Sequence, residues 1–437
     1  MRKRHSVTVL GLGHIGLPTA LAIALSGYRV IGVDINSDRV KAIQTGQLKI
    51  SEPGFDEKLR SALESGALNL RKDFDKEGRD SDVCLICVQT PLGRHREPDL
   101  QPVLSAVRTV ASSVRAGSFV SIHSSLPPCT TRTKIAPLLT RRSGLQCGKD
   151  FWLAVSPERM TPSQPLKEIF ENPRVVGGYT NQCAKVAASF YASFVKGPLF
   201  LTDATVAEAS KLAENAFRDV NIAFANELAL LCEKLRVPVQ EVIRIANTHP
   251  RVHILNPGPG VGGPCLPKDP LLLLSSAGRL NGVSVIRTAR RINDSMPEHA
   301  VKLVRQSLRK VGKTVRRSRI AVLGLAYKSN VDDIRNSPAL KIISLLERDG
   351  ALVRKFDPLA DRSLDGNRCD TLDEAFDRAD CIVILAEHDA IRDLDLLEMR
   401  KLTSDHPVIV DGRGLFTEQH ARESGFLYSG IGFSPNP

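Results

Sequence analysis

The first part of the chain alternates short apolar runs with amphipathic segments. Residues 6–10 (SVTVL) form the first run, residues 17–26 have the spacing of a helix, and residues 28–33 form the next run. Further runs of the same kind stand at 83–88, 119–122 and 151–155. Strands that alternate with helices predict a doubly wound, parallel α/β domain over about the first 200 residues.

The middle of the chain has a different pattern. Residues 205–236 form one nearly unbroken helical pattern without glycine or proline. At about 1.5 Å per residue such a helix is roughly 48 Å long, which exceeds the width of a small domain. Its apolar side chains, among them Leu212, Phe217 and Leu231, lie on more than one face. A helix that is apolar on several sides is buried on several sides, so we expect it to connect domains and to pack between subunits.

The alternating pattern resumes in the last part of the chain. Residues 319–325 (RIAVLGL) match the strand and turn near the N-terminus, and residues 351–356 are predicted to form a strand that ends before Asp357. Between them a helix is predicted over 338–346, and two more strands are predicted at 381–385 and 408–410. We therefore predict an α/β protein with two Rossmann-like, doubly wound domains joined by a long central helix and a helical middle domain. The predicted domains are 1–203, 204–311 and 312–437.

The charge balance bears on the kind of ligand. The 437 residues include 60 Lys and Arg against 48 Asp and Glu, a formal net charge of +12. Such a balance suits nucleic acid or a small polyanion such as a nucleotide diphosphate. The basic residues are scattered and no nucleic-acid-binding module is recognisable. The small polyanion is therefore favoured, and no nucleic-acid partner is expected.

Cysteine usage indicates a reducing compartment. Nine cysteines are an odd number spread thinly over a long chain, which favours a cytoplasmic protein over a disulfide framework. Cys84 and Cys87 form a CxxC motif, but they lie in a predicted strand, where residues three apart point to opposite faces. No metal site is expected. Glycines and a proline interrupt the apolar stretch near the N-terminus, and no other apolar run reaches about 18 residues, so we expect no membrane association.

A glycine turn follows the first predicted strand. Gly11, Gly13 and Gly16 precede the helical pattern, and Asp34 ends the second apolar run. In this context the glycines form a tight turn, admit a pyrophosphate and let the helix pack on the strand, while the acid accepts from ribose hydroxyls. The acid repels a ribose phosphate, which favours NAD over NADP. The alternative, a glycine-rich turn without a ligand, is disfavoured by the complete strand–turn–helix–strand context.

One cysteine has a setting unlike the others. Cys265 follows Gly262 and Gly263 and precedes Lys268 and Asp269. Glycines let the backbone approach a ligand closely, and a cysteine before a helix loses its proton readily. Most of the other cysteines lie in apolar runs. Cys265 is therefore a candidate nucleophile, although its spacing alone leaves an inert role equally open.

Other polar residues are candidates on local grounds. Lys211 and Asn215 are four residues apart, so they share a helix face and together can stabilise an oxyanion. Two solvated polar residues are the commoner outcome of that spacing. Glu158 follows an apolar run, where α/β sheets place ligands, and can act as a general base or as a salt-bridged loop carboxylate. Arg413 can bind a phosphate group, or it can simply belong to a turn without a ligand.

Taken together, these segments resemble the UDP-glucose/GDP-mannose dehydrogenase family over essentially the whole chain. Seven segments carry the resemblance, in family order: GLGHIGLP, VQTPL with EPDL, HSSLPPCTT, SPERMTPSQPLKEIFENPRVVGG, AEASKLAENAFRDVNIAFANELALLCE, HPRVHILNPGPGVGGPCLPKDP and LGLAYKSNVDDIRNSPAL. Within the family, ENPRVVGG and ANTHPRVHILNPGPGVGG look like the UDP-N-acetyl-D-mannosamine branch. Pro264 differs from the histidine common in that branch, and the Lys268-Asp269 ending is similar to the UDP-glucose enzymes.

The resemblance implies an NAD-dependent, four-electron oxidation of the 6-hydroxyl of a UDP-N-acetylhexosamine, first of all UDP-N-acetyl-D-mannosamine. Cys265 would hold the aldehyde as a thiohemiacetal, and a second oxidation would give a thioester that water cleaves to the uronate. UDP-N-acetylglucosamine and UDP-glucose are the alternative substrates.

The resemblance also implies which residues are catalytic: Cys265, Lys211, Asn215, Glu158, Asp269 and Ser125. Lys211 and Asn215 would stabilise the oxyanions, Glu158 would handle water in the hydrolysis, and Asp269 would assist proton removal. Ser125 stands where the family usually has threonine, which keeps the hydroxyl.

Two sets of binding residues are implied by the same resemblance. The cofactor set is Gly11, Gly13, His14, Ile15, Asp34, Arg39, Thr90, Ser125 and Arg335. The substrate set is Glu158, Arg159, Lys211, Asn215, Arg251, Gly262, Lys328 and Arg413. Arg251 would reach the substrate of a neighbouring subunit, which implies a homodimer through the central helix. Lys328, Arg335 and Arg413 would face the UDP. Cys129 stands where the family has glycine.

Two further hypotheses concern the reaction itself. A two-electron reductase of the hydroxyacid kind shares the opening fold, but it has no use for Cys265 or for a second α/β domain. A nucleotide-sugar-binding protein without turnover is disfavoured by the set of Lys211, Asn215, Cys265 and Asp269. The number of NADH formed per sugar separates all three.

Overall fold

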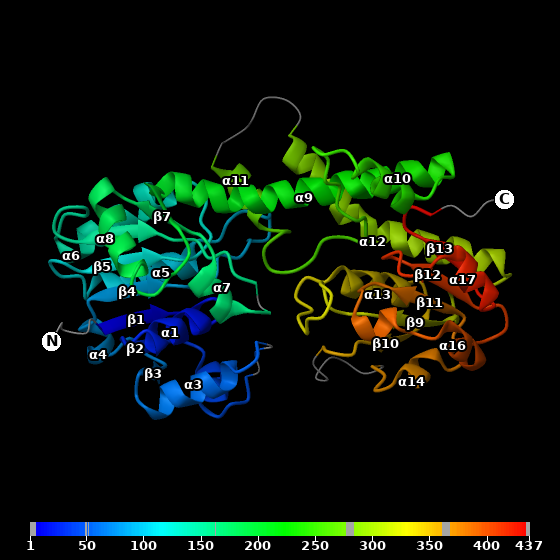
Figure 1. Ribbon diagram of the computed structural model, residues 1–437, viewed down its shortest axis with the longest axis horizontal. Coiled ribbons are helices and arrows are strands. Elements are labelled where there is room, and N and C mark those ends of the chain that lie inside the picture. Colours follow the sequence, from blue (N-terminus) through cyan, green and yellow to red (C-terminus); the bar gives the residue numbers. More distant parts are fainter. Residues whose placement is uncertain are drawn as a thin grey trace. The chain divides into compact units, whose positions relative to one another are not determined.

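The computed structural model of the chain describes residues 6–48, 50, 52–161, 163–276, 284–360 and 368–433. Its contacts divide the chain into two compact units, labelled by element in Figure 1. The first unit holds the described residues of 1–214 and 271–279, and the second holds those of 215–270 and 280–437. The expected α/β class, with two largely parallel sheets and a helical middle region, is confirmed.

The first unit is built on an eight-stranded sheet. The strands are β1 (Ser6–Leu10), β2 (Arg29–Val33), β3 (Leu68–Arg71), β4 (Val83–Ile86), β5 (Phe119–Ile122), β6 (Trp152–Val155), β7 (Arg174–Gly178) and β8 (Leu199–Asp203). Their order is β3-β2-β1-β4-β5-β6-β7-β8, and the first six strands have the order of a dinucleotide-binding sheet. Among these described strands, only β6 and β7 pair antiparallel. In the register, Leu10 lies beside Val33 on one side and Ile86 on the other, so the carboxyl ends of β1, β2 and β4 share one edge.

Helices cover both faces of this sheet. They are α1 (Gly16–Leu25), α2 (Ser37–Gln44), α3 (Phe55–Glu64), α4 (Lys76–Arg79), α5 (Gln101–Ala111), the π-helix η1 (Thr131–Ile135), α6 (Ala136–Ser143), α7 (Pro165–Glu171) and α8 (Asn181–Tyr191). Helices α1, α3, α7 and α8 share one apolar core, and α5 and α6 share the other. Strand residues alternate between these cores, because successive side chains point to opposite faces. Cys84 and Cys87 accordingly lie in different cores.

The second unit is built on a five-stranded parallel sheet. Its strands are β9 (Arg319–Leu323), β10 (Leu352–Phe356), β11 (Cys381–Ile384), β12 (Val408–Asp411) and β13 (Leu427–Gly430), in the order β10-β9-β11-β12-β13. Its helices are α10 (Val239–Ala246), α12 (Val285–Lys310), α13 (Pro338–Arg348), α14 (Leu372–Phe376), α15 (Asp389–Arg392), α16 (Leu396–Leu402) and α17 (Glu418–Glu423). α12 and α13 pack on one face, while α14, α15, α16 and α17 pack on the other.

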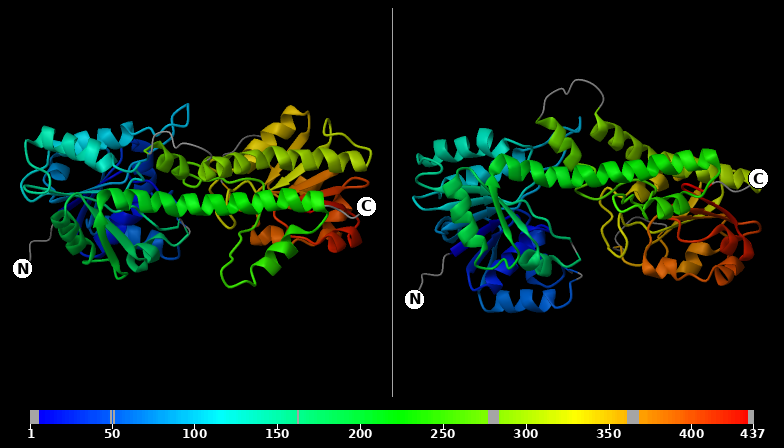
Figure 2. Two further views of the ribbon diagram at one scale, coloured as in Figure 1. Left: turned by 90° about the horizontal axis from the view of Figure 1, so that it is seen from above. Right: turned by 45° about the horizontal axis from the view of Figure 1, so that its top comes forward.

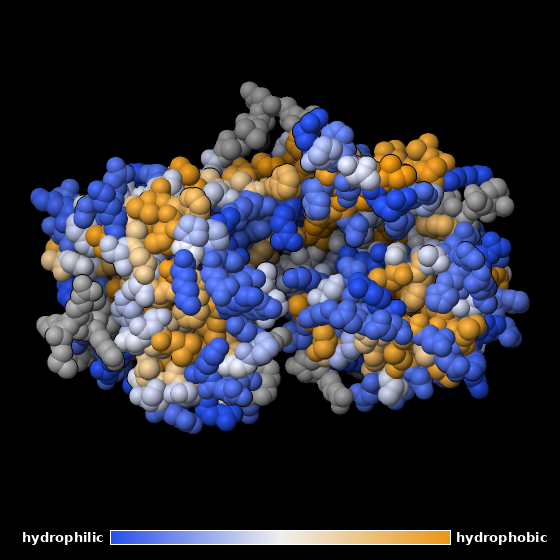
Figure 3. Space-filling model, in the orientation of Figure 1, coloured by the Kyte–Doolittle hydropathy of each residue, from blue (hydrophilic) through white to orange (hydrophobic). Residues whose placement is uncertain are grey.

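Helices α9 (Ala204–Leu235) and α11 (Asp269–Ser275) each belong in part to both units. α9 is a single helix of 32 residues, one residue displaced from the prediction, and both views of Figure 2 show it unbroken. Hydrophobic side chains gather at the surface over the end of α9 and α10 (Figure 3), and Leu235, Val237 and Ile245 are exposed there. Among the described residues, no helix is both long enough and apolar enough to cross a membrane.

Candidate active site

The glycine turn at the end of β1 has the geometry that the spacing predicts. Gly11 has a φ of +89°, in the left-handed region that favours glycine, and its N–H donates to the Val33 carbonyl at 2.7 Å. A Cβ at Gly16 would lie 1.7 Å from the Gly11 carbonyl oxygen, so only glycine lets α1 begin against the turn. A Cβ at Gly13 would meet nothing within 4 Å. The turn is therefore tight on its inner side and open beside Gly13.

Asp34 and Arg39 hold this turn from the second strand. The Asp34 carboxylate accepts from the N–H of Leu12 at 2.8 Å, and the Arg39 Nε donates to the Leu12 carbonyl at 2.6 Å. Asp34 is half-buried, and within the described part of the chain its two oxygens accept two backbone N–H bonds, from Leu12 and Asn36. A carboxylate can accept about four hydrogen bonds, so capacity remains for ribose hydroxyls.

Two further observations fit a dinucleotide. Ile15, the residue before α1, provides no side-chain cap, so the N–H of Gly16 at the start of that helix can face an anion, and His14 beside it is exposed. The buried Thr90 Oγ1 has no hydrogen-bond partner among the described residues. A buried hydroxyl in that state has its full capacity for a hydrogen bond to a bound ligand. The residues present here fit the pyrophosphate and ribose of NAD.

Glu158 lies in a buried polar cluster beyond β6. Because β7 runs antiparallel to β6, it begins where β6 ends, and its first residue, Arg174, reaches Glu158 at 2.9 Å and Ser156 at 3.2 Å. The Arg174 guanidinium also lies over the Tyr191 ring, 5.1 Å from its centroid. Sequence reasoning missed Arg174, because the pairing depends on the direction of β7.

The charges of this cluster set the state of Glu158. Burial alone would raise the pKa of the Glu158 carboxyl, but Arg174, His123 and the N–H of Arg159 outweigh it and hold the pKa below its ordinary value. Burial and Arg174 lower the pKa of His123 to about 3. Glu158 is therefore a carboxylate and His123 is neutral at pH 7. Such a carboxylate is a good hydrogen-bond acceptor and a weak base.

Ser125, Arg159 and Lys211 complete the candidates of the first unit. Ser125 follows Ser124, whose hydroxyl donates to the Val88 carbonyl at 2.6 Å. Arg159 pairs with Glu214 on α9 at 2.6 Å. Lys211 is half-buried, one helical turn before Asn215.

The second unit holds the nucleophile loop. Cys265 is exposed, and its carbonyl accepts from the N–H of Asp269 at 2.9 Å, so it occupies the turn that begins α11. The buried Asp269 carboxylate accepts from Asn215 Nδ2 and from Lys268 Nζ, each at 2.6 Å. The structure thus brings Asn215, Cys265 and Asp269 together. Of the other cysteines, only Cys129 is also exposed.

The two glycines before the cysteine are tightly packed. A Cβ at Gly262 would lie 2.7 Å from the Asn336 carbonyl oxygen, and one at Gly263 would lie 2.7 Å from the Tyr327 ring. Burial, with the charges of Asp333 and Cys265, raises the pKa of Tyr327 to about 12. Sequence reasoning missed Tyr327 as a neighbour of this loop, because no local signal marks it.

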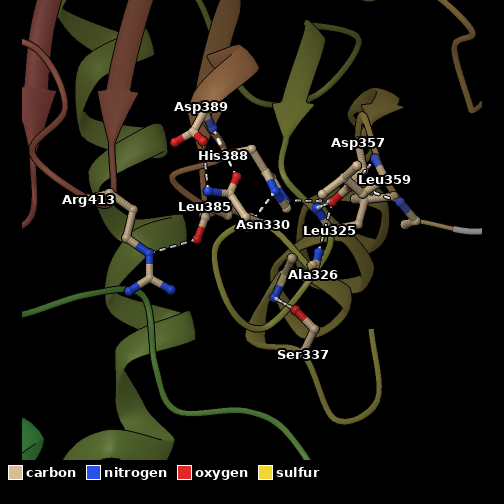
Figure 4. Close-up of polar contacts among 12 residues, drawn as sticks. Leu325, Ala326, Asn330, Ser337, Asp357, Leu359, Leu385, His388, Asp389 and Arg413 are labelled. Atoms are coloured by element: carbon tan, nitrogen blue, oxygen red, sulfur yellow. Dashed lines mark hydrogen bonds and ion pairs between the residues drawn. The ribbon is translucent and has the colours of Figure 1, made fainter. Parts of the chain in front are cut away.

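The remaining basic candidates of the second unit lie in separate settings. Arg335 is exposed and pairs with Asp333 at 2.6 Å, which raises the pKa of its guanidinium. Arg413 donates from Nε to the Leu385 carbonyl at 2.9 Å and points away from the cluster of Asp357 and His388 (Figure 4). Lys328 and Arg251 are exposed.

Comparison with known proteins places this geometry in a family. The NAD binding domain of the UDP-glucose/GDP-mannose dehydrogenase family matches residues 5–195, the central domain matches 205–295 and the UDP binding domain matches 321–418. The chain belongs to the UDP-glucose/GDP-mannose dehydrogenase family. It is a nucleotide-sugar dehydrogenase that uses NAD, and the resemblance seen in the sequence is confirmed.

Individual relatives of this family match over nearly the full length. The chain is 46% identical over 426 residues to UDP-N-acetyl-D-mannosamine dehydrogenase of Pyrococcus horikoshii, covering 98% of this chain and 99% of that protein. It is 38% identical over 422 residues to NDP-N-acetyl-D-galactosaminuronic acid dehydrogenase of Ralstonia solanacearum, covering 94% and 96%. The solved structure of UDP-D-ManNAc dehydrogenase from Pyrococcus horikoshii matches with a TM-score of 0.91 and 45% identity, covering 98% and 99%.

The family match locates the ligands at the level of domains. Gly11 and Asp34 fall in the NAD binding domain, and Lys328, Arg335 and Arg413 fall in the UDP binding domain. The roles of individual residues, and the domain boundaries at 203 and 311, stay predictions.

Proposed function

We propose that this nucleotide-sugar dehydrogenase oxidises the 6-hydroxyl of UDP-N-acetyl-D-mannosamine to the uronate, with four electrons removed in two steps. The observation that carries the proposal is the setting of Cys265, which is exposed behind two packed glycines and one turn before the Asn215–Asp269 contact. The relative from Pyrococcus horikoshii supports the choice of sugar.

The covalent step explains why a dehydrogenase needs a cysteine. The first oxidation removes a hydride and a proton from the 6-hydroxymethyl group and leaves an aldehyde. The Cys265 sulfur adds to the aldehyde carbon and the oxygen gains a proton, which gives a thiohemiacetal. Loss of a second hydride and the hydroxyl proton gives a thioester, and water cleaves its C–S bond to release the carboxylate and restore the thiol. The chemistry that NAD supplies when bound is acceptance of one hydride in each oxidation.

The other candidate side chains of the two units have separate roles in this proposal. The Lys211 ammonium and the Asn215 amide stabilise the negative oxygen of the aldehyde adduct. Asp269, held by Asn215 and Lys268, assists proton removal from the hydroxyl. Glu158 is held ionised by Arg174, so it orients the hydrolytic water by accepting a hydrogen bond.

A homodimer through α9 is part of the proposal. Phe217, Phe224 and Leu231 are exposed to 69%, 52% and 50% at seven-residue intervals. Seven residues make about two helical turns, so these side chains form one apolar stripe of the kind that pairs helices. In this dimer Arg251 reaches the sugar nucleotide of the neighbouring subunit. Sedimentation velocity tests the stripe, and a monomeric mass at micromolar concentration would refute the dimer.

The decisive experiment counts NADH with UDP-N-acetyl-D-mannosamine, UDP-N-acetylglucosamine and UDP-glucose in turn. Two NADH per sugar with the first substrate supports the proposal. If another sugar is preferred, the proposed substrate is wrong but the proposed four-electron reaction still holds. One NADH per sugar indicates a two-electron reductase, and none from any UDP-sugar indicates a binding protein.

Cys265→Ser tests the covalent step. We expect uronate formation to fall at least a thousandfold, while UDP-sugar affinity stays within about threefold, because the nucleophile is lost and the binding surface remains. Cys129→Ser is the matched control, since Cys129 is the other exposed cysteine. Uronate formed by Cys265→Ser at the wild-type rate would refute the covalent mechanism.

A further inference from the structure

Two asparagines of α9 contact the loop that carries Cys265, one on each side of the cysteine. Asn215 Nδ2 donates to the Asp269 carboxylate at 2.6 Å, after the cysteine. Asn226 Oδ1 accepts from the N–H of Gly258 at 2.8 Å, before it. The two asparagines are eleven residues apart, about three helical turns, so they share one face of α9. The loop is thus held at both ends by a single helix face.

The contact at Gly258 is the end of a longer chain of hydrogen bonds. Asn226 Nδ2 donates to Asn293 Oδ1 on α12 at 2.9 Å. Asn293 Nδ2 donates to the backbone carbonyl and to the Oδ1 of Asp219, at 2.9 and 2.8 Å. Arg290 pairs with the same Asp219 oxygen at 2.5 Å. All four side chains are buried, and we call this chain from Arg290 to Gly258 the amide relay.

The groups at the two ends of the amide relay determine which way its two side-chain amides are oriented. The backbone N–H of Gly258 can only donate, so Asn226 must turn its oxygen towards it. The Asp219 carboxylate beside Arg290 can only accept, so Asn293 must turn its NH₂ group towards it. The two amides between these ends then meet donor to acceptor, as the structure has them. Neither amide can flip without leaving a buried group unsatisfied.

The ion pair at the start of the amide relay is only partly satisfied. Asp219 Oδ2 and Arg290 Nε are buried without a hydrogen-bond partner among the described residues. Burial raises the pKa of Asp219 to about 6 against the effect of Arg290. A buried ion pair that is only partly satisfied is commonly no more stable than an apolar replacement. The relay also has a second effect, because its far end fixes the backbone at Gly258.

Gly258 lies against the guanidinium of Arg413. A Cβ on Gly258 would be 2.7 Å from Arg413 Nη1, so the backbone occupies the space beside that group. Arg413 Nε donates to the Leu385 carbonyl, so the position of its terminal nitrogens depends on the groups that pack against them. A shift of Gly258 therefore moves the guanidinium head.

We propose that Asn293 is a positioning residue for the nucleotide diphosphate of the substrate. Through Asn226 it fixes Gly258, and through Gly258 it fixes the guanidinium of Arg413. This inference rests on the proposed function, in which Arg413 faces the UDP. Asn293 itself is buried and contacts Asn226 and Asp219 within the relay, so its role is to position Gly258.

The test is Asn293→Asp, which changes one NH₂ group to an oxygen. The new carboxylate faces the Oδ1 and the backbone carbonyl of Asp219, so the relay loses its donor there while the side-chain volume stays nearly the same. We expect the Kd of UDP in calorimetry, and the KM of the UDP-sugar, to rise about tenfold or more. The kcat per active site should change less than about threefold, and the KM of NAD should not move. Asn69→Asp, an equal change on β3 of the first unit, should leave all of these constants at wild-type values.

A second variant keeps the test decisive if Asn293→Asp folds poorly. The exchange of Asp219→Asn with Asn293→Asp keeps the charge and restores one donor–acceptor contact, so it should recover part of the UDP affinity. A UDP affinity at the wild-type value in folded Asn293→Asp would overturn the proposal. The proposal would also be overturned if the variant contained fewer active molecules but each of them bound UDP with wild-type affinity. The proposed function fails separately, if the wild-type protein yields no NADH from any UDP-sugar while UDP still binds.

Discussion

At Gly11 and at Gly324 the chain leaves the first strand of a parallel sheet through the same backbone geometry. The two glycines have φ values of +89° and +84°. Each N–H donates to the carbonyl that ends the neighbouring strand, Val33 at 2.7 Å and Phe356 at 2.8 Å. The similarity of residues 319–325 to the start of the chain therefore reflects a repeated turn. The two units differ in the acid that closes this turn and in the helix beyond it.

The acids that close the two turns are used in different ways. Asp34 is half-buried and accepts two backbone N–H bonds. Asp357 is 2% exposed and accepts four backbone N–H bonds and one from His388 (Figure 4). Since the His388 Nδ1 accepts from the N–H of Asn330, its Nε2 carries the proton. Asp357 has no capacity left for a ribose, whereas Asp34 has.

The helix after each turn differs as well. α1 begins at Gly16, within the turn, so its N-terminus lies directly beside the space where a pyrophosphate would bind. In the second unit α13 begins only at Pro338, after a long loop that includes Tyr327. One turn is thus open to a dinucleotide, and the other is a closed structural element within the UDP binding domain. The βαβ pattern predicts the fold of both units, whereas the bonding of the acid and the start of the next helix distinguish the two turns.

Gly16→Ala is the substitution expected to disrupt the first turn most severely. Its Cβ would lie 1.7 Å from a backbone oxygen, so α1 must move away from the turn. We expect the first unit to lose about 3 kcal/mol or more of unfolding free energy and NAD binding to become undetectable. Trp152, the single tryptophan, lies on β6 and reports unfolding of this unit by fluorescence.

Gly13→Ala is the matched control for that variant. A Cβ there meets nothing within 4 Å, so the unfolding free energy should stay within about 0.5 kcal/mol. NAD affinity should still fall about tenfold or more, because the open space beside Gly13 is where the pyrophosphate approaches. Equal losses of stability in both variants would contradict this separation of packing from binding.

The next largest loss of stability is expected from Asp357→Asn, in the second turn. Burial raises the pKa of the carboxyl, but the hydrogen bonds from His388, Leu359 and Ala360 outweigh it and hold the pKa well below the ordinary 3.8. A lowered pKa in the folded state contributes stability that is present above about pH 4 and is lost as the pH falls further. We expect the variant to lose about 2–3 kcal/mol at pH 7, a difference that narrows below pH 4. Urea unfolding by circular dichroism from pH 3 to 7 measures it.

Asp34→Asn is the counterpart in the first turn. It should cost less than about 1 kcal/mol of stability, because Asp34 is half-buried and its amide replacement still accepts from Leu12. NAD affinity should fall about tenfold with the loss of the charged acceptor for the ribose. A larger loss of stability for Asp34→Asn than for Asp357→Asn would show that the two acids do not differ as described.

The features that the sequence predicted well are local. The turn at Gly11 to Gly16 and the helix α9 are predicted by residue spacing, because a glycine requirement and a helical period are visible within a few residues. The predicted neighbours of Cys265 in the chain, Lys268 and Asp269, are also its neighbours in space.

The features that the sequence did not predict depend on pairing between distant segments. The ion pair of Glu158 with Arg174 requires β7 to run antiparallel to β6, and no local pattern gives strand direction. The contact between Asn226 and Asn293 requires one face of α9 to meet one face of α12. In both cases a buried polar residue has its partner on a segment that is distant in the sequence.

The smallest expected effect concerns a turn where the first unit lacks a glycine. Cys129 has a φ of +72°, the region that Gly11 and Gly324 occupy without strain. A non-glycine residue in this conformation lowers the free energy of unfolding by about 1–2 kcal/mol. Glycine removes this strain, but it also makes the unfolded chain more flexible, which offsets part of the gain. Cys129→Gly should therefore stabilise the first unit by about 0.5–1 kcal/mol, measured by Trp152 fluorescence in urea. Cys129→Ala removes the thiol but keeps the strained backbone, so it should give no gain. An equal gain from both variants would show that the thiol, rather than the φ angle, is what destabilises this turn.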